Sequence, residues 1–248
     1  MKKVVLLIAL LCLVTGSIFA GGQAESDVIK IATDATWPPM EYIDENSDLV
    51  GFDVDLINAI AEEAGLTVEL QNSAWDGIFA GLANGAYDAI ISSVTITEDR
   101  KAAMSFTAPY INAGQVLIVR TDSEGLNSID DMAGLKVGAQ NGTTGDFAIE
   151  DRPEIKRMAY DEIGLAVEDL MNGNLQGVVC DSITASDFVL GNENYSKSLM
   201  VVGEAFTEEW LGIAVQKSNP ELVEKLDAGL AAVKASGKHA ELVAKWLH

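Results

Sequence analysis

The most constraining feature of this sequence is a repeated alternation of short apolar strands and amphipathic helices. In the first part, strands are expected at residues 28–32, 66–70 and 87–91, and helices at 52–64, 75–83 and 98–106. In the second part, strands are expected at 115–120, 135–139, 177–180, 199–202 and 211–215, and helices at 146–150, 163–171, 182–190, 220–236 and 238–247. Such alternation is typical of parallel-rich sheets with helices on both faces. We therefore expect an α/β protein built from two units of about 90 residues each.

The first twenty residues differ from the rest and have the pattern of an export signal. Residues 2–3 are a lysine pair, residues 4–14 are apolar, and Ala20 is the small residue that a signal peptidase requires. We therefore expect residues 1–20 to be a signal peptide and the mature protein to be periplasmic. A lipid-anchored form is less favoured, because a bulky leucine precedes Cys12.

The charge and the cysteine content exclude several classes of protein. The net charge is -22 at pH 7, and loss of the two leader lysines makes it -24, which argues against binding to nucleic acid or to anionic membranes. Only Cys180 remains after the leader, so no intramolecular disulfide is possible. The two histidines, His239 and His248, form no zinc-binding spacing. We therefore expect no metal, no cofactor and no nucleic-acid partner.

Residues 92–100 form a candidate anion-binding turn between a strand and a helix. Four hydroxyl side chains lie within residues 92–97, and Thr97 is expected to cap the helix. Arg100 then falls in the first helical turn, where a cation opposes the helix dipole. The position makes sense if the guanidinium and free backbone N–H groups bind one anion together, and the planar fork of arginine suits a carboxylate. The alternative is a surface arginine that offsets the two acidic residues before it.

The chemically distinctive clusters lie where the predicted strands end. They are Asp34, residues 92–100, the turn 142–145 and Asp181. Ligands of open α/β sheets bind beyond the carboxyl ends of the strands, so this coincidence predicts a cleft between two lobes. Two alternatives stay open, because Asp181 could only cap the following helix and residues 142–145 could form only a tight turn. Nucleotide binding is disfavoured, because no Walker lysine follows this turn.

A series of short motifs occurs in order along the whole mature chain. It comprises Ala32-Thr33-Asp34, Trp37-Pro38-Pro39-Met40-Glu41, Gly51-Phe52-Asp53-Val54-Asp55-Leu56, Trp75-Asp76-Gly77-Ile78, residues 95–100, Gln140-Asn141-Gly142-Thr143-Thr144-Gly145, Asp181 and Gly212-Ile213-Ala214-Val215. In this combination the sequence resembles the type 3 extracellular solute-binding proteins of polar amino-acid ABC transporters. The resemblance implies a two-lobed, periplasmic-binding-protein-like fold of type II with a ligand cleft between the lobes.

The resemblance also implies how the chain is divided. Lobe 1 would comprise residues 27–115 and 211–248, lobe 2 residues 120–207, and the hinge strands would lie near 115–119 and 208–211. The protein would be a monomer that delivers its ligand to the permease of an ABC transporter. Two departures from the family pattern stand out. Relatives for histidine and basic amino acids often carry a disulfide in lobe 1, which this chain cannot form, and Gly145 replaces a larger polar residue of some relatives.

The family pattern implies a role for nine side chains. Arg100 would hold the ligand α-carboxylate with help from Thr95, and Thr144 would close on that carboxylate from lobe 2. Asp181 would bind the α-ammonium group with the assistance of Ser93. The pocket for the ligand side chain would be lined by Asp34, Trp37, Trp75 and Ser92.

The choice of ligand depends on the two tryptophans and the aspartate of that pocket. Two aromatic faces, Trp37 and Trp75, with Asp34 between them suit a guanidinium or an ammonium group through cation–π contacts and an ion pair. Arginine is therefore our first prediction, followed by lysine or glutamine. The tryptophans could instead be ordinary core aromatics, and Asp34 could accept from an amide, in which case glutamine would bind best.

Two other classes of function remain as alternatives. Some relatives on this scaffold are periplasmic dehydratases of the cyclohexadienyl dehydratase type, in which Asp34, Glu41 or Asp181 could serve as a general acid. No histidine is available for this chemistry and no nucleophile–base pair is visible, so we expect a protein that is not an enzyme. The third class is a ligand-sensing partner of a receptor.

Overall fold

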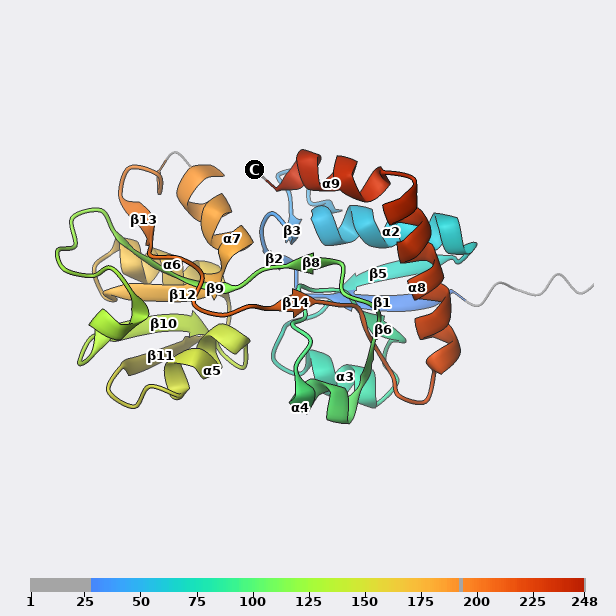
Figure 1. The fold of residues 1–248 in the computed structure, drawn as a ribbon, viewed down its shortest axis with the longest axis horizontal. Helices are drawn as coiled ribbons and strands as arrows, with labels where there is room; N and C mark the ends of the chain where they lie inside the picture. Colours follow the sequence, from blue (N-terminus) through green and yellow to red (C-terminus); the bar gives the residue numbers. More distant parts are fainter. Residues whose placement is uncertain (1–27, 192–193, 248) are drawn as a thin grey trace, which may run out of the picture.

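Two lobes joined by a pair of crossing segments make up the described part of the protein, residues 28–191 and 194–247 of a computed structural model (Figure 1). Each lobe has a five-stranded sheet at its centre. The predicted signal peptide, residues 1–20, lies outside the described residues. None of the helices in the described ranges is long and apolar enough to cross a membrane.

The sheet of the first lobe has the strand order β5-β1-β6-β15-β7. β1 (Ile29–Thr33) pairs in parallel with β5 (Val68–Asn72) and β6 (Ala89–Ile90). β15 (Ala214–Val215) pairs in the antiparallel direction with β6 and with β7 (Ser105–Phe106). Because β15 follows the second lobe in sequence, the first lobe is discontinuous.

The sheet of the second lobe repeats this topology in the order β11-β10-β12-β9-β13. β10 (Lys136–Gln140) pairs in parallel with β11 (Lys156–Tyr160) and β12 (Gly177–Asp181). β9 (Gln115–Arg120) pairs in the antiparallel direction with β12 and with β13 (Leu199–Val202). Each sheet therefore includes one antiparallel strand that lies next to a crossing between the lobes.

Two short antiparallel strands, β8 (Ile111–Asn112) and β14 (Trp210–Leu211), lie where the chain crosses between the lobes (Figure 1). The two crossing segments also approach each other closely at Gly114. A Cβ atom at this position would lie 2.1 Å from the carbonyl oxygen of Thr207. Glycine is therefore the residue that allows the two backbones to lie side by side.

Helices cover both faces of each sheet (Figure 1). The first lobe has α2 (Phe52–Ala64), α8 (Pro220–Ala235) and α9 (Lys238–Trp246) on one face, and α3 (Ile78–Ala83) and α4 (Glu98–Ala103) on the other. The second lobe has α6 (Ile163–Met171) and α7 (Ser182–Ser186) on one face and α5 (Thr144–Glu150) on the other. Leu56, Ile57 and Ile60 of α2 are fully buried, and burial of such an apolar stripe is the main driving force for this packing.

The remaining elements are short. A three-stranded sheet beside α2 consists of β2 (Thr36–Trp37), β3 (Glu41–Ile43) and β4 (Leu49–Val50). The second lobe also has two short helices, η1 (Ile129–Met132) and η2 (Asp187–Gly191). The three-stranded sheet carries Trp37, which packs into an apolar cluster made of residues from the second lobe. The two lobes are therefore in contact at Trp37 as well as along the crossing segments.

The structure differs from the sequence-based expectation at several elements. The expected helix 75–83 begins only at Ile78, and the expected helix 98–106 ends at Ala103 because the next residues pair as β7. The expected strand 211–215 is interrupted and contributes to both β14 and β15. The sequence pattern does not predict β11, because this strand is largely exposed and has no apolar run.

Candidate ligand-binding site

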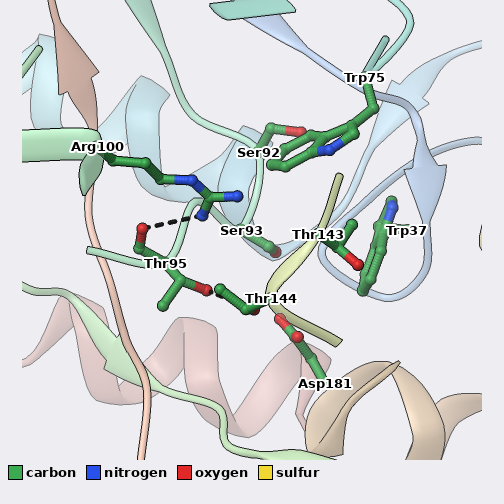
Figure 2. Close-up of a pocket in the computed structure, with 9 residues that line it drawn as sticks. All are labelled: Trp37, Trp75, Ser92, Ser93, Thr95, Arg100, Thr143, Thr144 and Asp181. Atoms are coloured by element: carbon green, nitrogen blue, oxygen red, sulfur yellow. Dashed lines mark hydrogen bonds between the residues drawn. The ribbon is translucent and has the colours of Figure 1, made fainter. Parts of the chain in front are cut away.

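A pocket lies between the two lobes and receives side chains from both (Figure 2). Its cavity is small in this structure, about 10 Å³, which is about the space that one water molecule needs. The lining residues are Trp37, Trp75, Ser92, Ser93, Thr95 and Arg100 from lobe 1 and Thr143, Thr144 and Asp181 from lobe 2. The structure therefore brings together all the predicted site residues except Asp34, and it adds Thr143.

The turn after β6 carries Arg100 into this pocket. Thr97 caps α4, because its hydroxyl accepts a hydrogen bond from the backbone N–H of Arg100 at 3.2 Å. Nη1 of Arg100 donates to the carbonyl oxygen of Thr95 at 3.0 Å, and Nη2 donates to that of Gly142 at 3.5 Å. The guanidinium carbon also lies 5.4 Å from the centre of the Trp75 ring. These contacts hold the guanidinium at one end of the pocket.

The charge of Arg100 is not paired within the described part of the chain, where no carboxylate lies within ion-pair distance of it. Burial lowers the pKa of Arg100 to about 10, although the charges of Glu209 and Asp181 oppose this shift. The guanidinium therefore remains charged at neutral pH. Glu98 pairs with Lys101 instead, which argues against a surface arginine that offsets its acidic neighbours. This end of the pocket suits an anion.

Asp181 reaches the pocket from the second lobe, at the end of β12. It is 6% exposed and accepts a hydrogen bond from Nε2 of Gln115 at 2.5 Å. Burial, together with the charge of Glu209, raises the pKa of Asp181 to about 8. Its side chain makes no capping hydrogen bond to α7, so the interpretation that Asp181 only caps this helix is wrong. A buried carboxyl group of this kind suits a cationic partner that would stabilise its charged form.

The turn 142–145 forms another part of the wall of the pocket. Gly142 has a φ of 73°, a left-handed conformation that glycine adopts without steric cost. Thr143 caps α5 with its hydroxyl, which places Thr144 at the start of the helix. The hydroxyl of Thr144 lies 3.3 Å from that of Thr95 across the cleft. The segment is thus a tight turn and, in addition, a part of the pocket.

Asp34 lies behind the pocket wall and contacts the second lobe. It is 2% exposed, and its carboxylate accepts hydrogen bonds from Gln140 at 2.8 Å and from Thr36 at 3.1 Å. Gln140 in turn accepts a hydrogen bond from the indole N–H of Trp37. Burial raises the pKa of Asp34, while the hydrogen bond from Gln140 lowers it. Asp34 would therefore have to exchange Gln140 for a ligand group in order to bind a ligand.

Comparison with known proteins identifies the family. The family model of the bacterial extracellular solute-binding proteins, family 3, matches residues 29–248. The chain belongs to this family. A probable histidine-binding protein of Neisseria gonorrhoeae is 36% identical over 225 residues, which cover 88% of this chain and 82% of that protein. The ABC transporter arginine-binding protein 1 of Escherichia coli strain K12 is 34% identical over 248 residues, which cover 99% of each chain.

The fold of this family 3 protein is also that of solved structures. An ancestral arginine-binding protein bound to arginine aligns with a TM-score of 0.85 and 37% identity, covering 89% of this chain and 98% of that chain. The predicted two-lobed fold of type II is therefore confirmed. The family accounts for the repeated topology of the two sheets and for the position of the pocket between them.

Glu209 contacts residues of the candidate site and is not predicted by the sequence analysis. It lies just before β14 and is 7% exposed. Its Oε2 atom accepts hydrogen bonds from the hydroxyls of Thr95 at 2.8 Å and Thr144 at 2.6 Å, so one carboxylate oxygen joins the two lobes. Glu209 is one of 38 acidic residues in the chain, and nothing in its neighbourhood in the sequence distinguishes it.

Gln115, the first residue of β9, is a second residue near the pocket that the sequence analysis does not predict. Its Nε2 atom donates to Asp181 and lies 3.2 Å from the Thr144 hydroxyl and 3.4 Å from Glu209. A Cβ atom at Gly145 would lie 2.6 Å from Oε1 of Gln115, so the glycine leaves the space that Gln115 occupies. The small residue at position 145 leaves this space, but the sequence does not indicate which side chain fills it.

Proposed function

We propose that this protein binds a polar L-amino acid, with arginine as the first choice, and delivers it to the permease of an ABC transporter. The observation that carries the proposal is that Arg100 from one lobe and Asp181 from the other line a single pocket. A free amino acid carries one positive and one negative charge, so its site needs a cation and an anion on facing walls. Membership in family 3, with relatives named for arginine and histidine, supports the same function.

In the proposed complex, the α-carboxylate lies against Arg100 and the hydroxyls of Thr95 and Thr144. The α-ammonium group lies against Asp181, with Ser93 as a further acceptor. The ligand carboxylate would then take over two hydroxyl donors that Glu209 uses in this structure. Both charges of the ligand are satisfied only when the lobes are together, so the ligand favours the closed arrangement.

The side-chain pocket favours a ligand with a second positive charge. Trp37 and Trp75 both line the pocket and offer aromatic faces, each of which contributes about 0.5–2 kcal/mol to the binding of a cation. Asp34, Asp181 and Glu209 outnumber Arg100, so the acidic groups around the pocket exceed the basic ones. Arginine meets both conditions, and lysine or glutamine would follow.

A thermal-shift screen over the twenty amino acids and prephenate tests this function. We expect arginine to raise the unfolding temperature most and prephenate to leave it unchanged. Asp34→Asn should weaken arginine about tenfold and glutamine less, because only arginine brings a cation to the carboxylate. Stabilisation by prephenate alone would favour the dehydratase alternative, and tenfold tighter binding of glutamine than of arginine would end the arginine assignment.

Lobe closure is the mechanical part of the proposal. We propose lobe boundaries at residues 27–115 with 211–248, and 120–207. The predicted hinge range 115–119 lies within β9 of the second sheet, whereas β8 and β14 connect the lobes, so rotation should occur next to these two strands. Small-angle scattering should show a smaller radius of gyration with saturating ligand. An unchanged radius, with binding confirmed by calorimetry, would argue against a hinge between the lobes.

We also propose a periplasmic location and a monomeric state for the mature protein. Family 3 is a family of extracellular proteins, and the charged, then apolar, start of the sequence has the form of an export signal. Cell fractionation with mass measurement of the purified protein should give a periplasmic, monomeric product that lacks residues 1–20. A cytoplasmic or dimeric product would contradict this proposal.

A further inference from the structure

Two carboxyl groups of the first lobe lie buried directly beneath the pocket. Glu41 of β3 and Asp53 of α2 are both 0% exposed. Glu41 accepts hydrogen bonds from the hydroxyl of Ser92 at 3.0 Å and from that of Ser93 at 3.4 Å. Both serines line the pocket. Glu41 is therefore separated from the ligand space by a single layer of side chains.

The contacts of Asp53 indicate that it shares one proton with Glu41. Oδ2 of Asp53 accepts hydrogen bonds from the backbone N–H of Ser93 at 2.8 Å and from the hydroxyl of Tyr110 at 2.9 Å. Its other oxygen, Oδ1, is buried and lacks a donor among the described residues, unless Glu41 carries a proton. Burial and the neighbouring Asp53 charge raise the pKa of Glu41 well above its usual range, whereas burial raises that of Asp53 only to about 6. A proton on Glu41 would supply the donor that the buried Oδ1 atom of Asp53 otherwise lacks.

This arrangement determines the direction of the hydrogen bonds made by the two serines. Each hydroxyl has one hydrogen, and both hydrogens point down to Glu41. Oγ of Ser92 also accepts a hydrogen bond from the backbone N–H of Asp34 at 2.9 Å. Within the described residues, Ser93 has no such donor, so its lone pairs remain free to face the pocket. Ser93 is held in a left-handed conformation, with a φ of 48°, by the bond from its N–H to Asp53.

We propose that Glu41 is a positioning residue for the ammonium group of the ligand. By accepting the hydroxyl hydrogens of Ser92 and Ser93, it makes Ser93 an acceptor toward the pocket. An ammonium group can only donate hydrogen bonds, so it needs such an acceptor beside Asp181. The inference rests on the proposed function, because it requires a ligand with an ammonium group.

Glu41→Gln is the substitution that reverses this hydrogen-bond pattern while keeping the volume. The glutamine amide can donate one hydrogen to Asp53, as the shared proton does, but its second hydrogen then points to one of the serines. Where the amide nitrogen takes the place of the oxygen that faces Ser93, this serine turns its own hydrogen toward the pocket. A donor then faces the ammonium group in place of an acceptor.

Calorimetric titration with two ligands separates this role from a structural one. The ligands are L-arginine and 5-guanidinopentanoate, which is arginine without its amino group. We expect Glu41→Gln to weaken arginine about tenfold and the analogue less than about twofold, because only arginine brings the ammonium group. Equal weakening of both ligands would show a structural role and would overturn the proposal. Asp55→Asn is the matched control. Asp55 lies in the same helix as Asp53, but it pairs with Lys245 on the outside of the lobe, so its loss should leave both affinities unchanged.

A second measurement uses arginine alone. Ser93→Gly removes the acceptor and suits the left-handed backbone, so it should weaken arginine about tenfold. In the Ser93→Gly background, Glu41→Gln should cost less than about twofold, because the two changes remove the same interaction. Fully additive losses, or normal arginine binding by Ser93→Gly, would overturn the proposal even if Glu41→Gln alone did not fold.

The failure of this inference is distinguishable from failure of the proposed function. If the wild-type protein bound none of the twenty amino acids, the proposed function itself would be wrong. If the wild type bound arginine but Glu41→Gln weakened both ligands equally, only the positioning role would be lost.

Discussion

Arg100→Ala is expected to abolish amino-acid binding while leaving the protein folded. The substitution would leave the ligand carboxylate buried without a cation, at a cost of roughly 3–5 kcal/mol, which is a loss of at least about a hundredfold in affinity. The fold should tolerate the change, because Arg100 makes no ion pair within the described residues and its side chain loses mainly the hydrogen bond to the Thr95 carbonyl. Calorimetry with arginine and thermal unfolding of the variant test both parts.

Two further variants serve as comparisons for Arg100→Ala. Arg100→Lys keeps the charge but loses the planar fork, so it should bind more weakly than the wild type and more tightly than Arg100→Ala. Lys101→Ala removes the next cation in the sequence, which pairs with Glu98 on the surface, and should bind normally. Near-normal affinity in Arg100→Ala would disprove the assignment of the anion site.

Arginine affinity is expected to increase about tenfold per pH unit as the pH is raised toward 8, because Asp181 must lose a proton to pair with the ammonium group. In the protein alone the pKa of Asp181 is about 8, so the carboxyl group is mostly neutral at pH 7. The ammonium group of the ligand lowers this pKa, and binding therefore releases a proton. Above pH 8 the carboxylate is already charged and the dependence should level off.

The raised pKa of Asp181 also predicts how the stability of the ligand-free protein depends on pH. This stability should decrease as the pH rises, whereas the affinity for arginine increases. The folded protein holds the Asp181 proton more tightly than the unfolded chain, in which an aspartate has a pKa of about 3.9. This group therefore stabilises the folded state below about pH 4, and its contribution becomes increasingly unfavourable as the pH rises toward 8. Ligand binding offsets the loss by providing the ammonium group.

Asp181→Asn provides the decisive comparison for the pH dependence. The variant should bind arginine weakly at pH 8 and show little change between pH 6 and pH 8, because the titrating group is gone. Asp53, whose pKa is raised to about 6, lies beneath the pocket and remains in the variant. Any pH dependence of arginine affinity that Asp53 causes would therefore persist in Asp181→Asn. Calorimetry in buffers of different ionisation enthalpy should detect the released proton in the wild type only. A wild-type affinity that did not change with pH would contradict the role of Asp181.

The sequence alone was sufficient to predict the fold class and much of the site. Periodicity records which face of each element is buried, so the alternation of strands and helices indicated two α/β units before any contact was known. The position of Arg100 could be predicted because it depends on a local cap by Thr97, three residues away. Strand β11 could not be predicted, because an exposed edge strand needs no apolar pattern.

Only the tertiary structure decided which residues complete the site. Glu209 bonds to Thr95 across 114 positions of sequence, and Gln140 bonds to Asp34 across 106. Such contacts leave no periodicity, because they arise where the chain passes twice between the lobes and brings distant segments to one cleft. The sequence determined the elements and the charged groups at their ends through local interactions. The double crossing determined which polar groups meet, because hydrogen bonds between distant segments depend on the packing of the whole chain.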